Sequence, residues 1–474
     1  MIFSSLVFLY VFLPTVLLLY YMIRKSYRNY LLFLASLIFF AWGGVSYSAL
    51  LIVSIIFNYL IGRRIAVSEK AKVWLLFGVI INISLLGVFK YAGLFTETIN
   101  VFLGLTQNSL LPIPEILLPI GISFYTFQAM SYLIDIYRKE AEVQKNIANL
   151  GLYISLFPQL IAGPIVRYHD ISLQINNRAH TYEKFSEGVL RFVLGLAKKT
   201  LIANNLAIVA DQVFNTPAGE ISTLAAWIGI IAYTFQIYYD FAGYSDMAIG
   251  LAKMFGFDLL ENFNFPYISK SIQEFWRRWH ISLSSWFRDY LYIPLGGNRI
   301  GVKRTYVNLF IVFFVTGLWH GSSWNFVVWG LIHGLFIVIE RLGFKNTLKK
   351  LPALFSGTYT LFIAMMAWVL FRAEDFGFAK EFYMTLFGFS NTTDIDVDLA
   401  LMINSEFVLS LMIAIFGAFG GFMLIKKQLL KTLSTNLLAK LKPISYSLFI
   451  IIIMILVTTY LANSTYNPFI YFRF

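Results

Sequence analysis

The stretch that decides the fold runs from Asn262 to Arg299 and reads NFNFPYISKSIQEFWRRWHISLSSWFRDYLYIPLGGNR. It continues through basic residues into Thr316 to Gly334, which reads TGLWHGSSWNFVVWGLIHG. Arginines, tryptophans and three of the five histidines lie here, inside or against apolar sequence. Ionisable groups are costly at membrane depth and usually have a function there. We therefore interpret 262–334 as the core of the candidate active site, within one transmembrane domain that covers 1–474.

The composition places the rest of the chain in a bilayer. The 474 residues are 58% hydrophobic and only 13% charged, against about 25% charged residues in soluble domains. The formal charge of +12 is concentrated at the ends of apolar segments, which fits the positive-inside rule and requires no nucleic-acid partner. The chain has no cysteine, which excludes a thiol nucleophile and cysteine metal ligands. We expect no metal and no resident cofactor.

The apolar segments predict an all-α polytopic protein. The length rule gives about 11 transmembrane helices, with additional re-entrant and interfacial helices. Basic residues follow the first and third apolar segments, and a Gly43–Gly44 turn joins the second to the third, so the basic ends of these helices are expected in the cytoplasm and the N-terminus outside. The acidic stretch 373–406 is predicted to be an external loop, and 95–115 a loop or short interfacial piece. Two prolines, Pro158 and Pro164, make the segment 150–165 irregular.

A boundary helix is predicted after Asn262. Ser271 to Glu274 form a capping box, and Pro294 with the glycines behind it ends the helix. Its tryptophans share one face with His280 on the flank. Three arginines and an aspartate exclude a lipid-exposed span, so the helix is expected to lie at the cytoplasmic boundary. The apolar face consists of Trp276, Trp279, Leu283, Trp286 and Tyr290, and the charged residues are Arg277, Arg278, Arg288 and Asp289.

A helical hairpin is predicted between Arg304 and Arg341. Basic residues flank it on both sides, and Gly321-Ser322-Ser323 is a turn signal between two short apolar runs. His320 follows Arg304 by 16 residues, roughly 24 Å along a helix. His320 is therefore expected far from the cytosol, either at the apex of a re-entrant hairpin or at the far surface between two tilted spans.

His320 is the candidate general base, because an imidazole with pKa ~6.5 can take a hydroxyl proton near neutral pH. His280 is expected to orient it or to stabilise charge on the reacting carbonyl; structural packing is the alternative for each histidine, and it is preferred for His333. Asp240 and Asp246 are expected to form ion pairs, with Arg277 or Arg278 as candidate partners. No G-x-S-x-G elbow or phosphate-binding glycine motif is present.

These residues resemble the membrane-bound O-acyltransferase family, and within it the alginate O-acetyltransferase branch. The resemblance rests on PQLIAGPIVRYHD (Pro158 to Asp170), YYDFAGYSDMAIG (Tyr238 to Gly250), the stretch from Asn262 to Arg299 and GLWHG (Gly317 to Gly321). The D-alanyl transfer protein of teichoic-acid modification shares part of the Asn262–Arg299 stretch. The resemblance implies a ring of helices with a central tunnel, His320 as catalytic histidine and His280 as the second functional histidine.

The implied activity is acyl transfer, most simply of acetyl, from an acyl-CoA or acyl-carrier thioester in the cytoplasm to an extracellular or periplasmic hydroxyl. The hydroxyl would belong to a polysaccharide or to a partner such as an extracytoplasmic acetyltransferase. The expected location is the bacterial cytoplasmic (inner) membrane. D-alanyl transfer and a transporter or flippase are the alternatives. Substrate or donor contacts are expected from Asn262, Trp276, Arg277, Arg278, Trp279, Arg288 and Trp319.

Overall fold

The computed structural model describes the whole chain except residues 106–108, 115, 390–402, 433–434, 464–465 and 471–474. The described residues form helices and connections, and none of them forms a strand, which confirms the all-α prediction. The chain divides into two compact units. The first comprises 1–189 and 248–260, and the second comprises 190–247 and 261–473.

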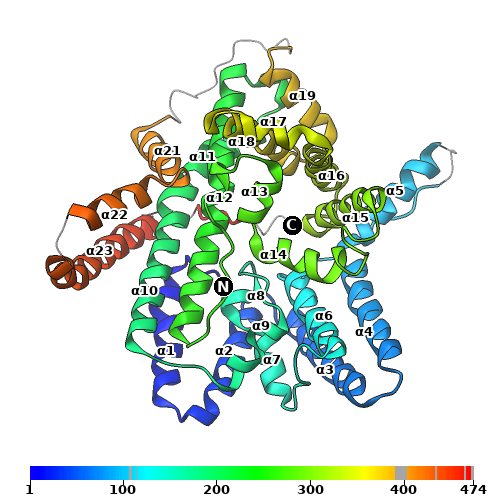
Figure 1. The fold of residues 1–474 in the computed structure, drawn as a ribbon, viewed down its shortest axis with the longest axis vertical. Coiled ribbons are helices and arrows are strands. Elements are labelled where there is room, and N and C mark those ends of the chain that lie inside the picture. Colours follow the sequence, from blue (N-terminus) through cyan, green and yellow to red (C-terminus); the bar gives the residue numbers. More distant parts are fainter. Residues whose placement is uncertain (106–108, 115, 390–402, 433–434, 464–465, 471–474) are drawn as a thin grey trace. The chain divides into compact units, whose positions relative to one another are not determined.

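The first unit is built around one buried helix, α6 (Ile122–Arg138). Nearly every α6 side chain from Ile122 to Ile136 is buried. α6 packs against α3 (Val45–Val67), α4 (Ala71–Leu86) and α9 (Tyr168–Asn176), as Figure 1 shows for α3 and α4. The remaining helices of this unit are α1 (Leu13–Met22), α2 (Arg28–Ala41), α5 (Ala92–Leu105), α7 (Ile147–Ser155), α8 (Phe157–Leu160) and the start of α10 (Tyr182–Ala197).

Two sequence predictions fall in this unit. The irregular backbone at 150–165 is confirmed, because α7 ends at Ser155 and α8 is a single turn. Of the two alternatives for 95–115, the loop is wrong as far as Leu105, because α5 continues the helical run that begins at Ala71. The short interfacial piece stays a prediction. No proline interrupts the sequence before Pro112, so the helix has no reason to end earlier.

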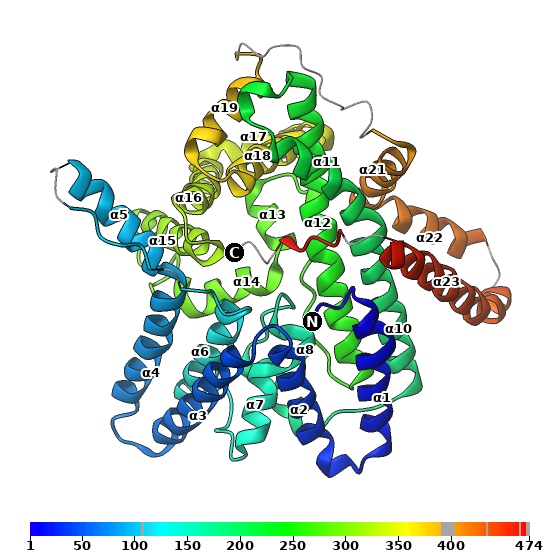
Figure 2. The same ribbon diagram turned by 180° about the vertical axis from the view of Figure 1, so that it is seen from behind.

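The second unit contains the motif-bearing helices. α15 (Val302–His320) and α16 (Trp324–Ile339) pack side by side, and α16 also contacts α18 (Ala353–Arg372) and α13 (Ile272–Arg278). Figure 2 gives the opposite view of these helices. The other helices are α11 (Asn204–Asn215), α12 (Thr223–Met254), α14 (Ile281–Phe287), α17 (Lys345–Lys350), α19 (Phe376–Leu386), α21 (Ser405–Ala418), α22 (Gly421–Thr432) and α23 (Thr435–Asn463).

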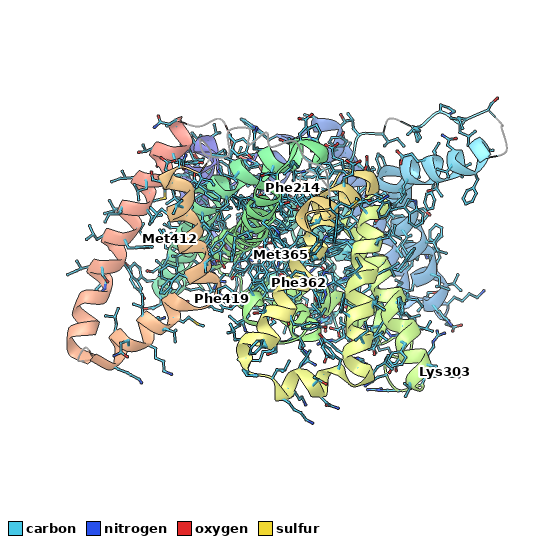
Figure 3. All side chains as sticks on the ribbon, turned by 90° about the horizontal axis from the view of Figure 1, so that it is seen from above. Phe214, Lys303, Phe362, Met365, Met412 and Phe419 are labelled. Carbon is cyan, nitrogen blue, oxygen red and sulfur yellow. The ribbon has the colours of Figure 1, made fainter. Side chains whose placement is uncertain are left out.

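Several outer surfaces of the second unit are apolar. Phe362 on α18 and Met412 and Phe419 at α21 are exposed (Figure 3). Lys303 is exposed at the first turn of α15 and projects away from the helices (Figure 3). Exposed apolar side chains on helices of this length fit contact with lipid.

Six described helices are long and apolar enough to cross a membrane, or seven if α21 and α22 count as one bent span. The protein is therefore a multi-pass membrane protein. The count of about 11 stays a prediction, because helices such as α6 and α15 are too short or too polar to be counted as spans by length and composition. The central tunnel also stays a prediction. In the predicted external loop, α19 occupies 376–386, and 390–402 lie outside the described residues.

The hairpin prediction is confirmed as a pair of adjacent helices, with Gly321 to Ser323 as the turn. Small residues let the two backbones approach closely. A Cβ at Gly317 of α15 would lie 2.4 Å from the carbonyl oxygen of Phe326, and one at Gly330 of α16 would lie 2.3 Å from that of Phe313. The two placements of this hairpin, re-entrant or membrane-spanning, stay predictions.

Replacing Gly317 by alanine is expected to destabilise the protein by about 1–3 kcal/mol, because the backbone of Phe326 cannot move aside cheaply. Thermal unfolding of the purified protein measures the effect. The matched control is Gly357→Ala in α18, where a Cβ meets nothing within 4 Å. That change should be neutral or stabilising by about 0.5–1 kcal/mol, as for Gly→Ala in a helix interior. Equal unfolding temperatures for the two variants would contradict the close-approach argument.

Candidate active site

His280 marks a break in the predicted boundary helix. The N-cap half of the capping box is confirmed, since Ser271 Oγ accepts the Glu274 amide at 3.0 Å, whereas the Glu274 carboxylate accepts the amide of Lys270 at 3.0 Å. The single helix is wrong: α13 ends at Arg278, and α14 begins at Ile281. His280 has φ +45°, a left-handed conformation that is unusual for a residue with a Cβ. Such conformations persist where surrounding contacts over-determine them and are frequent at functional sites.

The side chain of Asn262 supplies those contacts. Its Oδ1 lies 3.1 Å from Nδ1 of His280 and accepts from both the amide nitrogen (3.2 Å) and the hydroxyl (2.9 Å) of Ser282. Its Nδ2 donates to Ser245 Oγ on α12 at 3.0 Å. Because the Ser282 amide can only donate, the oxygen of Asn262 must face His280. His280 therefore carries its proton on Nδ1 and presents Nε2 as a lone pair.

His280 is completely buried, and its Nε2 has no hydrogen-bond partner among the residues that the structure describes. Burial lowers the pKa of His280 to about 3, so the ring is neutral at physiological pH. The ring of Phe241 packs edge-on against it, with the two centroids 4.6 Å apart. Through the lone pair on Nε2, a neutral imidazole can accept a proton or a hydrogen bond, but it cannot donate a hydrogen bond there.

His320 lies at the C-terminal end of α15, and only 4% of it is exposed. Its ring centroid lies 6.2 Å from that of His280. Aromatic rings surround it: the centroids of Trp329, Trp319 and Phe371 lie 4.9, 5.0 and 5.4 Å away. The structure thus brings together the two histidines that the sequence selected, inside an aromatic enclosure where electrostatic interactions are strong.

The other predicted contact residues divide into two groups. Trp319 touches both histidines, and Trp276 and Trp279 are buried one layer away. Trp276 packs on Trp329 and His333 (5.8 and 5.3 Å), whereas Trp279 packs on Trp368 (5.0 Å). The arginines do not join this cluster. Arg278 pairs with Glu274 at 2.9 Å, and Arg288 pairs with Asp289 at 2.7 Å.

A cavity of about 400 Å³ opens beside α13 and α14. Its wall is mostly apolar, with Trp276 and Phe313 among the lining residues, and Arg277, Arg288 and Arg341 also line it. A second space of about 630 Å³ shares Gln273 and Arg341 with it and adds Arg299 and Lys345. An apolar chamber that adjoins a basic one suits a ligand with an apolar reactive end and an anionic remainder.

Glu340 holds α13 in place. This carboxylate is 1% exposed and lies where α16 ends. It accepts the first amides of α13, from Ile272 at 2.6 Å and from Gln273 at 3.1 Å. The helix that carries Trp276 and Arg277 is thus fixed to the hairpin that carries His320.

Glu340→Gln is expected to cost about 1–3 kcal/mol of stability, because the two α13 amides bond to different carboxylate oxygens and the side-chain NH2 of glutamine would replace one of them with a donor facing a donor. Thermal unfolding measures the loss. Glu374→Gln, an exposed acid in the same unit, is the control and should change the unfolding temperature little. If the two variants unfold alike, Glu340 does not cap α13.

The ion-pair prediction for the α12 aspartates is right about pairing and wrong about the partners. Asp240 pairs with Lys199 at 2.7 Å, with both side chains 2% exposed. Asp246 pairs with Arg191 at 2.6 Å and with Lys198 at 2.5 Å. Both lysines lie in the helical run from Tyr182 to Asn215, which precedes α12 in the chain. A sequence without long-range distances could not distinguish these partners.

One described group of side chains has the types that bind metal ions: Asp135, Glu140 and His169 of the first unit. His169 lies 3.0 Å from Asp135 and 3.3 Å from Asp170. Hydrogen bonds to Asp135 and then to Asp170 raise the pKa of His169 to about 10. A protonated imidazole supplies one positive charge to the two carboxylates and Arg167 supplies a second to Asp170 at 2.7 Å, so these side chains form an ion-pair network.

Phe241, Ser245, Trp329, Trp368 and Phe371 complete the site and were not predicted. Ser245 lies in the α12 motif that was noted only for its aspartates. Trp329 follows Trp319 across the hairpin turn, so the predicted pairing of the two apolar runs was the available signal for it. The aromatic residues of α18 carry no such signal, since an apolar helix alone does not reveal its neighbours.

Known proteins with similar sequences cover most of this chain. A family model described as MBOAT, membrane-bound O-acyltransferase family, matches residues 137–373. The chain is 47% identical over 400 residues to the probable alginate O-acetylase AlgI of Pseudomonas syringae pv. tomato, covering 82% of this chain and 76% of that protein. It is 38% identical over 413 residues to the peptidoglycan O-acetyltransferase of Helicobacter pylori (79% and 77%). It is 30% identical over 273 residues to the teichoic acid D-alanyltransferase of Bacillus subtilis (55% and 67%).

Proposed function

This chain belongs to the membrane-bound O-acyltransferase family and is an O-acyltransferase, and from that premise we propose which groups it joins. It moves an acetyl group from a cytoplasmic thioester to a hydroxyl outside the cytoplasmic membrane. The hydroxyl belongs to a polysaccharide or to a partner protein that passes the group on. The enzyme prediction is confirmed over the transporter alternative. The observation that carries the proposal is the burial of His320 and His280 together, 6.2 Å apart.

In this proposal His320 takes the proton of the attacking hydroxyl. The oxygen then attacks the thioester carbonyl and the carbon–sulfur bond breaks. The thiolate leaves as a thiol, with the proton that His320 took from the hydroxyl. His320 lies at the end of α15 among aromatic rings that limit its contact with water. General-base catalysis of this kind contributes about 10²–10⁴-fold.

The tautomer of His280 narrows its role. Two roles were considered for His280: orienting His320 and stabilising a developing oxyanion. Stabilising an oxyanion requires a hydrogen-bond donor. Nε2 of His280 carries a lone pair, and the Nδ1 proton is already bonded to Asn262. We therefore assign it the orienting role: Nε2 accepts a hydrogen bond from the hydroxyl or from the imidazole of His320. Asn262 then acts by positioning His280, in place of the substrate contact predicted for it.

The donor side of the proposal rests on the two adjoining cavities. The apolar chamber suits the acyl end and its thioester arm, and Arg277, Arg288 and Arg341 lie where the phosphates of coenzyme A or an acidic carrier protein would meet positive charge. Arg299 and Lys345 extend this charge into the second chamber. Arg278 and Arg288 are each paired with a neighbouring carboxylate, Glu274 at 2.9 Å and Asp289 at 2.7 Å. Only Arg288 lines the cavity, so we omit Arg278 from the donor site.

The acceptor is tested by mass spectrometry of envelope polysaccharides from cells with and without this chain. The proposal expects an acetyl ester that is lost with the protein and restored by expressing it. If the ester lost with the protein is a D-alanyl ester, the transferred group is D-alanyl and not acetyl. An unchanged ester content in every polymer would overturn polysaccharide acylation.

A further inference from the structure

A basic pocket of about 190 Å³ lies in the first unit, far along the sequence from the histidine site. Its lining comes from the connection between α1 and α2 and from the connection between α9 and α10. Figures 1 and 2 place both connections at the same end of this unit. Lys25, Arg28, Arg178 and His180 line it, and no carboxylate does. The volume far exceeds the roughly 10–15 Å³ that one water molecule needs.

We propose that this pocket binds a phosphate group, supplied either by a phospholipid headgroup or by a free phosphate compound. A fixed arginine, a stacked arginine and an exposed lysine line it. The pocket is placed where headgroups of the cytoplasmic leaflet are expected from the positive-inside rule. The site is separate from the proposed acyl transfer and does not depend on it.

Arg178 is preorganised for an anion. Its Nε donates to Tyr20 Oη at 3.0 Å and to the Phe255 carbonyl at 3.1 Å, and its Nη1 donates to Asn29 Oδ1 at 2.7 Å and to the Ile175 carbonyl at 2.8 Å. These partners are neutral, so they fix the guanidinium without cancelling its charge. Nη2 makes none of these bonds, and a planar, fixed guanidinium suits phosphate recognition.

Arg28 and Lys25 add charge that nothing in the described part of the chain neutralises. The guanidinium of Arg28 stacks 4.9 Å from the ring centroid of Tyr20 and 5.4 Å from that of Tyr21. Its Nε is buried and has no hydrogen-bond partner among the described residues. Lys25 is exposed beside it. Like charges held together without a counter-ion repel, and a bound phosphate would relieve that repulsion.

His180 contributes a neutral polar wall. Its Nε2 lies 2.7 Å from Tyr20 Oη. Burial first, and then Arg28, Arg178 and Lys25, lower its pKa to about 4. Burial and, after it, the surrounding positive charge thus keep the histidine uncharged, and a bound anion would offset the second of these two causes.

The test measures lipid bound to the purified full-length protein by native mass spectrometry after adding phosphatidylglycerol or phosphatidylcholine. The pocket variant is K25Q/R28Q. The matched control is K70Q/K72Q, which removes two exposed lysines, one just before α4 and one in its first turn. We expect the pocket variant to lose about tenfold or more of its phosphatidylglycerol affinity, and the control less than about threefold. A second arm adds inorganic phosphate and follows thermal unfolding.

Each outcome decides the proposal. A lipid headgroup is supported if K25Q/R28Q, but not the control, loses phosphatidylglycerol binding and if inorganic phosphate does not raise the unfolding temperature of the parent protein. Protection of the parent protein, but not of K25Q/R28Q, by inorganic phosphate supports a free phosphate compound. Equal retention by the parent and both variants, or equal loss in both variants, overturns the site. If K25Q/R28Q fails to fold, R28K and K25Q replace it: R28K should keep binding, K25Q should weaken it, and the reverse order contradicts the proposal.

Discussion

Replacing His320 by alanine is expected to lower acyl transfer by about 10²–10⁴-fold while the protein still inserts and accumulates. The imidazole is the group proposed to take the hydroxyl proton, and alanine cannot take it. The packing around the site also loses a ring, so the purified variant should be less stable by about 2–4 kcal/mol, as for other buried large-to-small changes. The rate is measured as loss of the labelled acyl group from the thioester donor, with detergent-purified protein. Thermal unfolding gives the stability.

The control for this change is His333→Ala. His333 is also completely buried, on the adjacent helix of the same hairpin, and packs against Trp276 and Trp329. It has the same side chain and a comparable packing role. The comparison therefore separates the loss of the proposed base from the loss of ring packing. We expect it to lose stability but to keep activity within about tenfold. A His320→Ala protein that accumulates normally and leaves polymer acylation unchanged would exclude His320 as the base.

The sequence predicted those parts of the site that depend on local patterns. The capping box at Ser271, the turn at Gly321 to Ser323 and the position of His320 at the end of a helix all follow from residue spacing. The arrangement of α15 beside α16 follows from the same spacing, because a short turn makes two helices antiparallel neighbours.

The rest depends on contacts between distant residues. The apolar periodicity from Trp276 to Tyr290 predicts one helix, and the left-handed backbone of His280 interrupts it because Asn262 binds its ring from outside the helix. Propensity and periodicity contain no term for such a contact. The same reason explains the wrong partners for Asp240 and Asp246: many cations were available in the sequence, and only the packing of α12 selects among them.

The second large effect is expected at Asn262, whose oxygen fixes the tautomer of His280. Asn262→Ala frees both tautomers and lets the ring rotate. We expect acyl transfer to fall about ten- to hundredfold at every pH, the cost of a misplaced catalytic group. Because no charge is introduced, the shape of the pH profile should not change. Ser245→Ala, which removes only the support behind Asn262, should cause a smaller loss.

Asn262→Asp tests the same contact through charge. A carboxylate 3.1 Å from Nδ1 favours protonated His280 and raises its pKa from the value of about 3 that burial imposes. In the parent protein His280 stays neutral between pH 5 and 8 and adds no inflection there. In the variant, the neutral form is lost as the pH falls through the raised pKa, so kcat/KM should fall on the acidic side and recover as the pH rises.

A purely structural role for Asn262 would not produce that inflection. Asn308→Asp is the matched control, because Asn308 is a completely buried amide of the same unit that donates to the carbonyls of Leu295 and Gly297. It should destabilise the protein without reshaping the pH profile. Superimposable profiles for Asn262→Asp and the parent protein, at whatever overall rate, would mean that the ionisation of His280 does not matter for turnover. His280 would then be a packing residue, and the catalytic assignment would rest on His320 alone.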